Sequence, residues 1–111
     1  MDIPTADVAG VPDPVPDEVV VLDVREADEW EAGHVEGSLH VPLQELGGRY
    51  AELPGDRQTL VVCRVGSRSA YATGFLVSQG VDAVNLEGGL AAWERAGRPL
   101  VTDDGQPGFV A

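Results

Sequence analysis

Residues 59–69 read TLVVCRVGSRS and join an apolar run to a short polar loop. The apolar part, 59–63, is rich in β-branched residues and predicts a strand that is buried on both faces of a sheet. Gly66 and two arginines follow, and the apolar spacing of a helix begins directly after them. This order of strand, loop and helix predicts an α/β unit that holds Cys63 at the carboxyl end of its strand.

The alternation of strands and helices continues on both sides of this unit. Strands are expected at 5–8, 19–24, 38–41, 59–63 and 83–86. Helices are expected at 26–32, 43–53, 69–79 and 90–96. Two adjacent glycines weaken the middle of the second helix. Connections of this kind predict a parallel sheet that helices cover on both faces.

The length of 111 residues fits one domain. We expect an acidic, proline-rich N-terminal segment over 1–15, which holds a first edge strand and no helix. The folded domain is expected over 16–105, and a loose tail over 106–111. The N-terminus lacks the basic stretch and apolar core of a signal peptide, so a cytoplasmic location is expected.

The charge and cysteine counts exclude several classes of function. The chain has 19 acidic residues and 7 basic ones, with a net charge of -12. This charge repels phosphate, so we expect no binding to nucleic acid or to an anionic membrane surface. A single Cys forbids an internal disulfide and any zinc site built on several Cys ligands. We expect no metal and no cofactor.

Cys63 is the candidate nucleophile. The loop after it can turn its backbone N–H groups toward the sulfur, where a helix N-terminus adds a favourable dipole. We expect these groups, together with Arg64 and Arg68, to lower the thiol pKa from its usual value of about 8.5. A lone Cys after an apolar strand is often an inert core residue, but this loop composition favours an anion site. The candidate substrate-binding residues are Arg64, Val65, Gly66, Ser67, Arg68 and Ser69.

Residues 63–69 (CRVGSRS) closely resemble the active-site loop of the rhodanese family, the thiosulfate sulfurtransferases. Further segments resemble this family in the same order: LDVRE at 22–26, GHVEGS at 33–38, VPL at 41–43, GG at 88–89, AW at 92–93 and GRP at 97–99. The resemblance extends over about residues 19–101. It implies a rhodanese-like three-layer α/β/α fold with a central, mainly parallel sheet of about five strands. Residues 9–17 depart from the pattern, since many relatives have a helix there.

The resemblance also implies an activity. Cys63 would take sulfane sulfur from thiosulfate or another small anionic donor and hold it as a persulfide. An external acceptor, either cyanide or a thiol (a protein thiol included), would then remove the outer sulfur. Catalysis of this kind is mainly nucleophilic and electrostatic.

Two alternatives stay open at this point. Phosphatases and arsenate reductases on the same fold have a longer loop, whereas four residues separate Cys63 from Arg68 here. A shorter loop fits a sulfur atom better than a phosphoryl group, and the second Cys that arsenate reduction usually needs is missing. The other alternative is a non-catalytic interaction or regulatory module. The intact Cys63 and both arginines favour the enzyme.

Four further polar residues are candidates for supporting roles. Asp23 ends an apolar run at the same sheet edge as Cys63, where it either pairs with an arginine and orients the loop or caps a turn. Arg25 is expected to anchor the loop through a salt bridge. His34 and His40 are expected to be hydrogen-bonded supports, since a pre-formed thiolate needs no general base. Both tryptophans are expected in the core.

Overall fold

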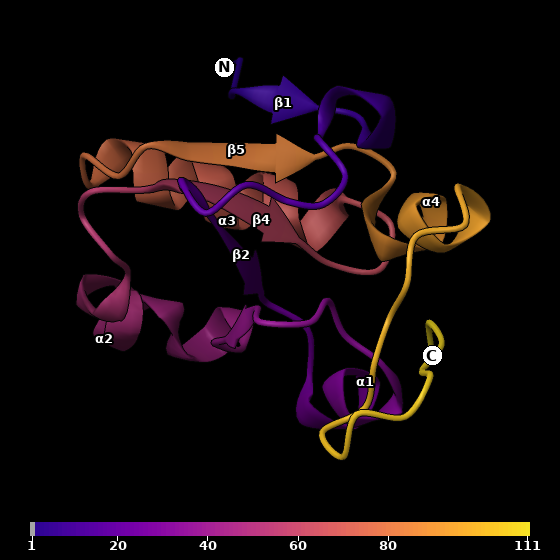
Figure 1. Cartoon of the computed structure of the whole chain (residues 1–111). Coiled ribbons are helices and arrows are strands. Elements are labelled where there is room, and N and C mark those ends of the chain that lie inside the picture. The colour runs from indigo at the N-terminus through magenta and orange to yellow at the C-terminus, as the bar shows by residue number, and fades with distance from the viewer. Residues whose placement is uncertain (1) are drawn as a thin grey trace.

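The computed structural model describes residues 2–111, which contain one five-stranded sheet (Figure 1). Its strands are β1 (Thr5–Ala6), β2 (Val19–Asp23), β3 (Leu39–His40), β4 (Gln58–Val62) and β5 (Ala83–Leu86). Their order across the sheet is β1-β5-β4-β2-β3, and every neighbouring pair runs parallel. The expected parallel α/β fold is confirmed.

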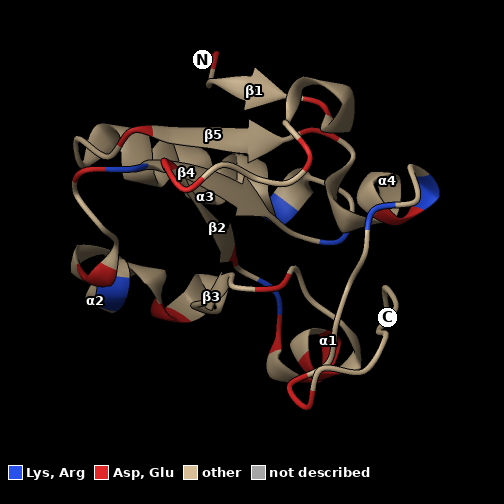
Figure 2. Cartoon of the chain, viewed as in Figure 1, with Lys and Arg blue, Asp and Glu red and all other residues tan. Residues whose placement is uncertain are grey.

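Three α-helices lie between these strands, α1 (Ala27–Ala32), α2 (Leu46–Arg49) and α3 (Ser67–Ser78), and a further helix, α4 (Gly89–Arg95), follows β5. Acidic residues lie on α1 and α4, in the turns on either side of α2, and in the loops at the ends of the sheet (Figure 2). Among residues 2–111, no helix has the length and apolar character that crossing a membrane requires.

The core has two parts, one on each face of the sheet. Consecutive strand residues point to opposite faces, so Leu22 and Val61 pack with α3 through Leu76. The other face, which includes Val21 and Val62, packs against Leu90 and Trp93 of α4. Both central strands are therefore buried on two sides, which explains why their sequences are continuous apolar runs rather than alternating ones.

The helix expected over 43–53 is broken into three short pieces. A 3-10 turn at Leu43–Glu45 precedes α2, and a second 3-10 turn at Tyr50–Glu52 follows it. Gly47 and Gly48 occupy the middle of α2, where their backbone freedom disfavours a longer helix. The apolar spacing was sufficient to place Leu46 in the core but not to sustain a regular helix.

The N-terminal segment is fastened to the domain by a buried arginine. Arg98 donates to the carbonyl oxygens of Val11 at 2.8 Å and Pro12 at 2.6 Å, and its guanidinium lies 4.1 Å from the centre of the Trp93 ring. The segment packs Val8, Val11 and Val15 against the α4 face of the sheet. It contains a short 3-10 turn at Val8–Gly10 where no helix was expected.

The C-terminal residues are held by hydrogen bonds, in contrast to the loose tail expected over 106–111. The N–H of Phe109 donates to Ala32 at 3.1 Å, and that of Gly108 donates to Leu100 at 2.8 Å. The backbone at 108–109 packs closely against Gly33, since a Cβ on Gly33 would lie 2.5 Å from the Phe109 nitrogen. Polar composition predicted mobility here, but this backbone pairing is invisible in the sequence.

Leu76 gives a test of the core on which the candidate site rests. Leu76 of α3 is 0% exposed, whereas its neighbour Val77 is 40% exposed. We expect Leu76→Ala to lower the free energy of unfolding by about 2–5 kcal/mol, because it leaves a cavity between α3 and the sheet. Val77→Ala should lower it by less than about 1 kcal/mol. Urea unfolding of both variants measures the difference, and equal losses would contradict this description of the core.

Candidate active site

The parallel pairing of β2 with β4 brings the candidate residues to one edge of the sheet. Asp23 is the register partner of Val62, so Asp23 and Cys63 meet at the carboxyl ends of adjacent strands. Cys63 begins the loop that leads into α3, and β5 lies on the other side of β4. This is the edge at which ligands bind in open α/β sheets.

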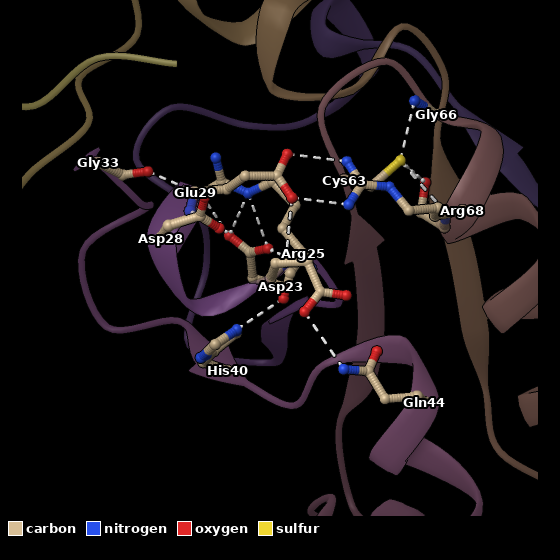
Figure 3. Close-up of polar contacts among 12 residues, drawn as sticks. Asp23, Arg25, Asp28, Glu29, Gly33, His40, Gln44, Cys63, Gly66 and Arg68 are labelled. Atoms are coloured by element: carbon tan, nitrogen blue, oxygen red, sulfur yellow. Dashed lines mark hydrogen bonds and ion pairs between the residues drawn. The ribbon is translucent and has the colours of Figure 1, made fainter. Parts of the chain in front are cut away.

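The sulfur of Cys63 is enclosed by donors from its own loop. The backbone N–H of Gly66 lies 3.1 Å from Sγ (Figure 3). The backbone N–H of Ser69 lies 3.3 Å from the same atom. The Ser69 hydroxyl is also 3.3 Å from Sγ and can donate to it. Cys63 is 0% exposed. The loop therefore forms a closed cup of N–H and O–H groups around a single sulfur atom.

These donors favour the thiolate. Burial raises the pKa of Cys63, and this is the largest single effect. The Ser69 hydroxyl and the N–H groups of Ser69, Gly66 and Val65 act in the opposite direction, and together they leave the pKa below its ordinary value. From the sequence, part of the lowering of the Cys63 pKa was expected from Arg64 and Arg68. In the structure the main cause is the ring of hydrogen-bond donors.

The loop conformation depends on glycines and on the N-terminus of α4. Gly66 has a φ of +103°, which turns its N–H toward the sulfur. The N–H groups of Leu90 and Ala91 donate to the carbonyls of Cys63 at 2.8 Å and Arg64 at 2.9 Å. Gly89 permits this close approach, because a Cβ there would lie 2.6 Å from the Cys63 oxygen. The cup is thus held from outside by α4.

The two loop arginines have different surroundings. Arg68 donates from Nη1 and Nη2 to the two carboxylate oxygens of Glu29, at 2.7 Å and 2.9 Å. Arg64 is exposed, as are Val65 and Ser67. Among the residues that the structure describes, the ion pairs include one for Arg68 and none for Arg64. Arg64 is consequently an exposed cation of this loop, whereas Arg68 is half-buried and paired.

Asp23 and Arg25 form a buried ion pair beneath this edge. The Arg25 guanidinium donates to Asp23 at 2.8 Å and to the carbonyl of Gly33 at 2.7 Å. His40 contacts the carbonyl of Arg25 at 2.8 Å. Arg25 therefore anchors the chain around α1 and β3, and its salt bridge goes to Asp23 rather than to the cysteine loop.

The histidines are hydrogen-bonded supports, as expected, and one tryptophan differs from the expectation. Nδ1 of His34 lies 2.8 Å from the carbonyl of Trp30. The Trp30 ring stacks on His34 with the ring centres 3.6 Å apart and on His40 at 4.8 Å. Trp93 lies in the core, but Trp30 is half-buried and stacks between the two imidazoles. Within residues 2–111 no group of three His, Cys, Asp or Glu side chains forms a candidate metal site.

Three residues at the site were not identified from the sequence. Glu29 was placed only within the helix expected at 26–32, and Gly89 only within the GG segment that resembles the family. Asn85 of β5 is buried, and its side-chain amide donates to the carbonyl of Gly66 at 3.4 Å. A polar residue inside the apolar strand 83–86 was the available signal for Asn85. The signal for Glu29 was absent, since its partner lies 39 positions away.

Comparison with known proteins places this geometry in a family. The family described as Rhodanese-like domain matches residues 12–96. A sulfurtransferase of Allochromatium vinosum is 37% identical over 90 residues, which are 80% of this chain and 84% of that protein. A rhodanese-related protein of Thermoplasma volcanium has a crystal structure with a TM-score of 0.85 and 33% identity, covering 90% of this chain and 99% of that one. A Mycobacterium tuberculosis HTH-type transcriptional regulator is 36% identical over 81% of this chain, which spans 40% of that longer protein.

Ser69 provides a test of the donors around the sulfur. Removing its hydroxyl in Ser69→Ala should raise the pKa of Cys63, because the thiolate loses one donor while the thiol loses little. The pH profile of alkylation by iodoacetamide, followed by intact mass, should move to higher pH, with a several-fold slower reaction at neutral pH. Ser67→Ala, which removes an exposed hydroxyl from the same loop, is the control and should leave the profile unchanged. Identical profiles for the two variants would contradict the assignment.

Gly89 provides a test of the support from α4. Gly89 and Gly97 both have positive φ values, +61° and +79°, but only Gly89 is crowded by neighbouring backbone. Gly97→Ala should cost about 1–2 kcal/mol of unfolding free energy from the backbone conformation alone. Gly89→Ala should cost clearly more and should also slow alkylation of Cys63, because the loop must shift. Equal losses in urea unfolding, with equal alkylation rates, would show that α4 does not hold the loop.

Proposed function

Because the chain belongs to the rhodanese-like domain family, we propose that it is a sulfurtransferase in which Cys63 carries the transferred sulfur. The observation that carries this proposal is the closed ring of donors around one sulfur atom, at 3.1–3.3 Å. Such a ring stabilises a thiolate and, after the reaction, a persulfide anion. The relative from Allochromatium vinosum is named a sulfurtransferase and supports the same chemistry.

The first half-reaction uses an anionic donor, for which thiosulfate is the proposed example. The Cys63 thiolate attacks the outer sulfur of thiosulfate. The new S–S bond forms as the old one breaks, and the electron pair of the old bond leaves with sulfite. The product is a Cys63 persulfide anion, so charge and electrons balance without a further reactant. The exposed Arg64 at the rim is the cation that would attract such a donor.

The second half-reaction needs an external acceptor. The chain has a single Cys, so no other thiol within these 111 residues can attack the persulfide. A thiolate or cyanide attacks the outer sulfur and leaves with it, which regenerates the Cys63 thiolate. Two separate half-reactions require ping-pong kinetics, with parallel double-reciprocal lines when donor and acceptor are varied.

The loop length supports this proposal over a phosphatase. Four residues stand between Cys63 and Arg68, and three of the donors already lie within 3.3 Å of Sγ. A loop of this length is expected to fit a sulfur atom on Cys63 better than a phosphoryl group with three oxygens. The remaining alternative, a non-catalytic interaction module, is separated from the enzyme by whether Cys63 accepts sulfur.

Mass spectrometry after donor treatment is the direct test. Incubation with thiosulfate should add the mass of one sulfur atom to the protein, and cyanide or a thiol should remove it. Cys63→Ser should abolish both the adduct and the turnover of thiosulfate while the circular dichroism spectrum is retained. Ser78→Ala, an exposed position at the other end of α3, serves as the control and should keep both the adduct and the turnover. Turnover by the serine variant, or intersecting kinetic lines without any adduct, would refute the proposed relay.

A further inference from the structure

The bidentate pair between Glu29 and Arg68 changes what the loop offers to an anion. An arginine fork binds a sulfonate or sulfate through two parallel N–H bonds. In the structure both terminal nitrogens of Arg68 already donate to Glu29, at 2.7 Å and 2.9 Å (Figure 3). Glu29 is also the more enclosed partner, with 16% of its side chain exposed against 35% for Arg68. A carboxylate of this chain therefore occupies the position that an anionic donor would take on Arg68.

Glu29 is held in place by its own helix as well. Oε1 of Glu29 accepts the backbone N–H of Glu26 at 3.1 Å, which forms the capping box at the start of α1. Hydrogen bonds from Arg68 lower the pKa of Glu29 to about 2, so its carboxylate is ionised across the neutral range. The carboxylate is thus a permanent and pre-positioned competitor for Arg68.

We propose that Glu29 is a specificity-determining residue that competes with anionic donors for Arg68 and so limits how tightly the site binds anions. This inference rests on the proposed function, in which the donor is an anion and the first product is sulfite. A cation left free beside the thiolate would hold both anions more strongly. With Arg68 neutralised, the Cys63 sulfur is stabilised by the N–H and O–H groups of the loop. Arg64 remains to attract the anionic substrate that supplies the sulfur.

The charged groups around Cys63 predict that anion binding becomes stronger when the Glu29 charge is removed. Arg68 and Glu29 neutralise one another on the α1 side, and Asp23 and Arg25 do the same beneath the sheet edge. Removing the Glu29 charge leaves Arg68 as an uncompensated cation near the sulfur. If Glu29 only fastened α1 to α3, its removal would loosen the loop and weaken anion binding. The two roles therefore predict opposite changes in anion affinity.

Protection of Cys63 by sulfate tests this competition without any turnover. Sulfate carries no transferable sulfur, and its binding at the loop should slow alkylation by iodoacetamide. In Glu29→Gln the sulfate concentration that halves the alkylation rate should fall by roughly threefold to tenfold, the effect of one freed charged hydrogen-bonding group. The pH profile of alkylation should also move to lower pH. Glu45→Gln is the matched control, since it removes the same charge from an exposed ion pair with Arg49, and it should change neither quantity.

A second substitution locates the effect on Arg68. In the double variant Glu29→Gln with Arg68→Gln, the gain in sulfate protection should disappear. Glu29→Asp keeps a carboxylate for α1, but its side chain is too short to accept both hydrogen bonds from Arg68. It should give a smaller gain in sulfate protection of the same sign. This variant replaces Glu29→Gln if the latter does not fold. Unchanged or weaker protection in a folded Glu29 variant, or a gain that survives the loss of Arg68, would overturn the proposal. Because these readouts need no sulfur transfer, they stand apart from a failure of the proposed activity.

Discussion

A thiolate buried in a protein of net charge -12 is stable only where hydrogen-bond donors are turned toward it. The loop after β4 meets this requirement with N–H groups of Gly66 and Ser69 and with the Ser69 hydroxyl. Dipoles fixed by the backbone act at short range and need no rearrangement when charge develops on the sulfur. The positive φ of Gly66, the start of α3 and the contact with α4 all follow from the need to aim these groups at one point.

Two of the three arginines at this edge are paired with a carboxylate. Asp23 pairs with Arg25 and Glu29 pairs with Arg68, whereas no ion pair of Arg64 occurs within residues 2–111. The hydrogen bonds that Arg68 donates to Glu29 raise the pKa of Arg68, and the charge of Cys63 contributes in the same direction. In the proposed mechanism, this local neutrality would keep the Cys63 sulfur from being bound tightly to a neighbouring guanidinium. It would also leave the attraction of an anionic ligand to Arg64, which is exposed.

The sequence predicted the sheet and the nucleophile loop because both depend on short-range patterns. Apolar runs place β2 and β4, and the glycine between two arginines marks the turn into α3. The predictions were wrong where long-range contacts decide. Trp30 stacks on two histidines, and the C-terminal residues pair with Ala32 and Leu100. The ion pair of Arg68 was not anticipated for the same reason, since its partner Glu29 lies in another helix and the pattern of charges along the chain does not pair them.

The burial of the sulfur has a consequence for any reaction at Cys63. The carbonyls of Cys63 and Arg64 are tied to α4, and Ser69 belongs to the first turn of α3. Both ends of the loop are therefore fixed, and the exposed residues Val65 and Ser67 lie between them. A displacement confined to this central part would break the Gly66 contact with the sulfur and keep both contacts from Ser69. A thiolate would then remain stabilised by α3 while a reactant approaches, which is the condition under which the enclosed Cys63 can act as a nucleophile.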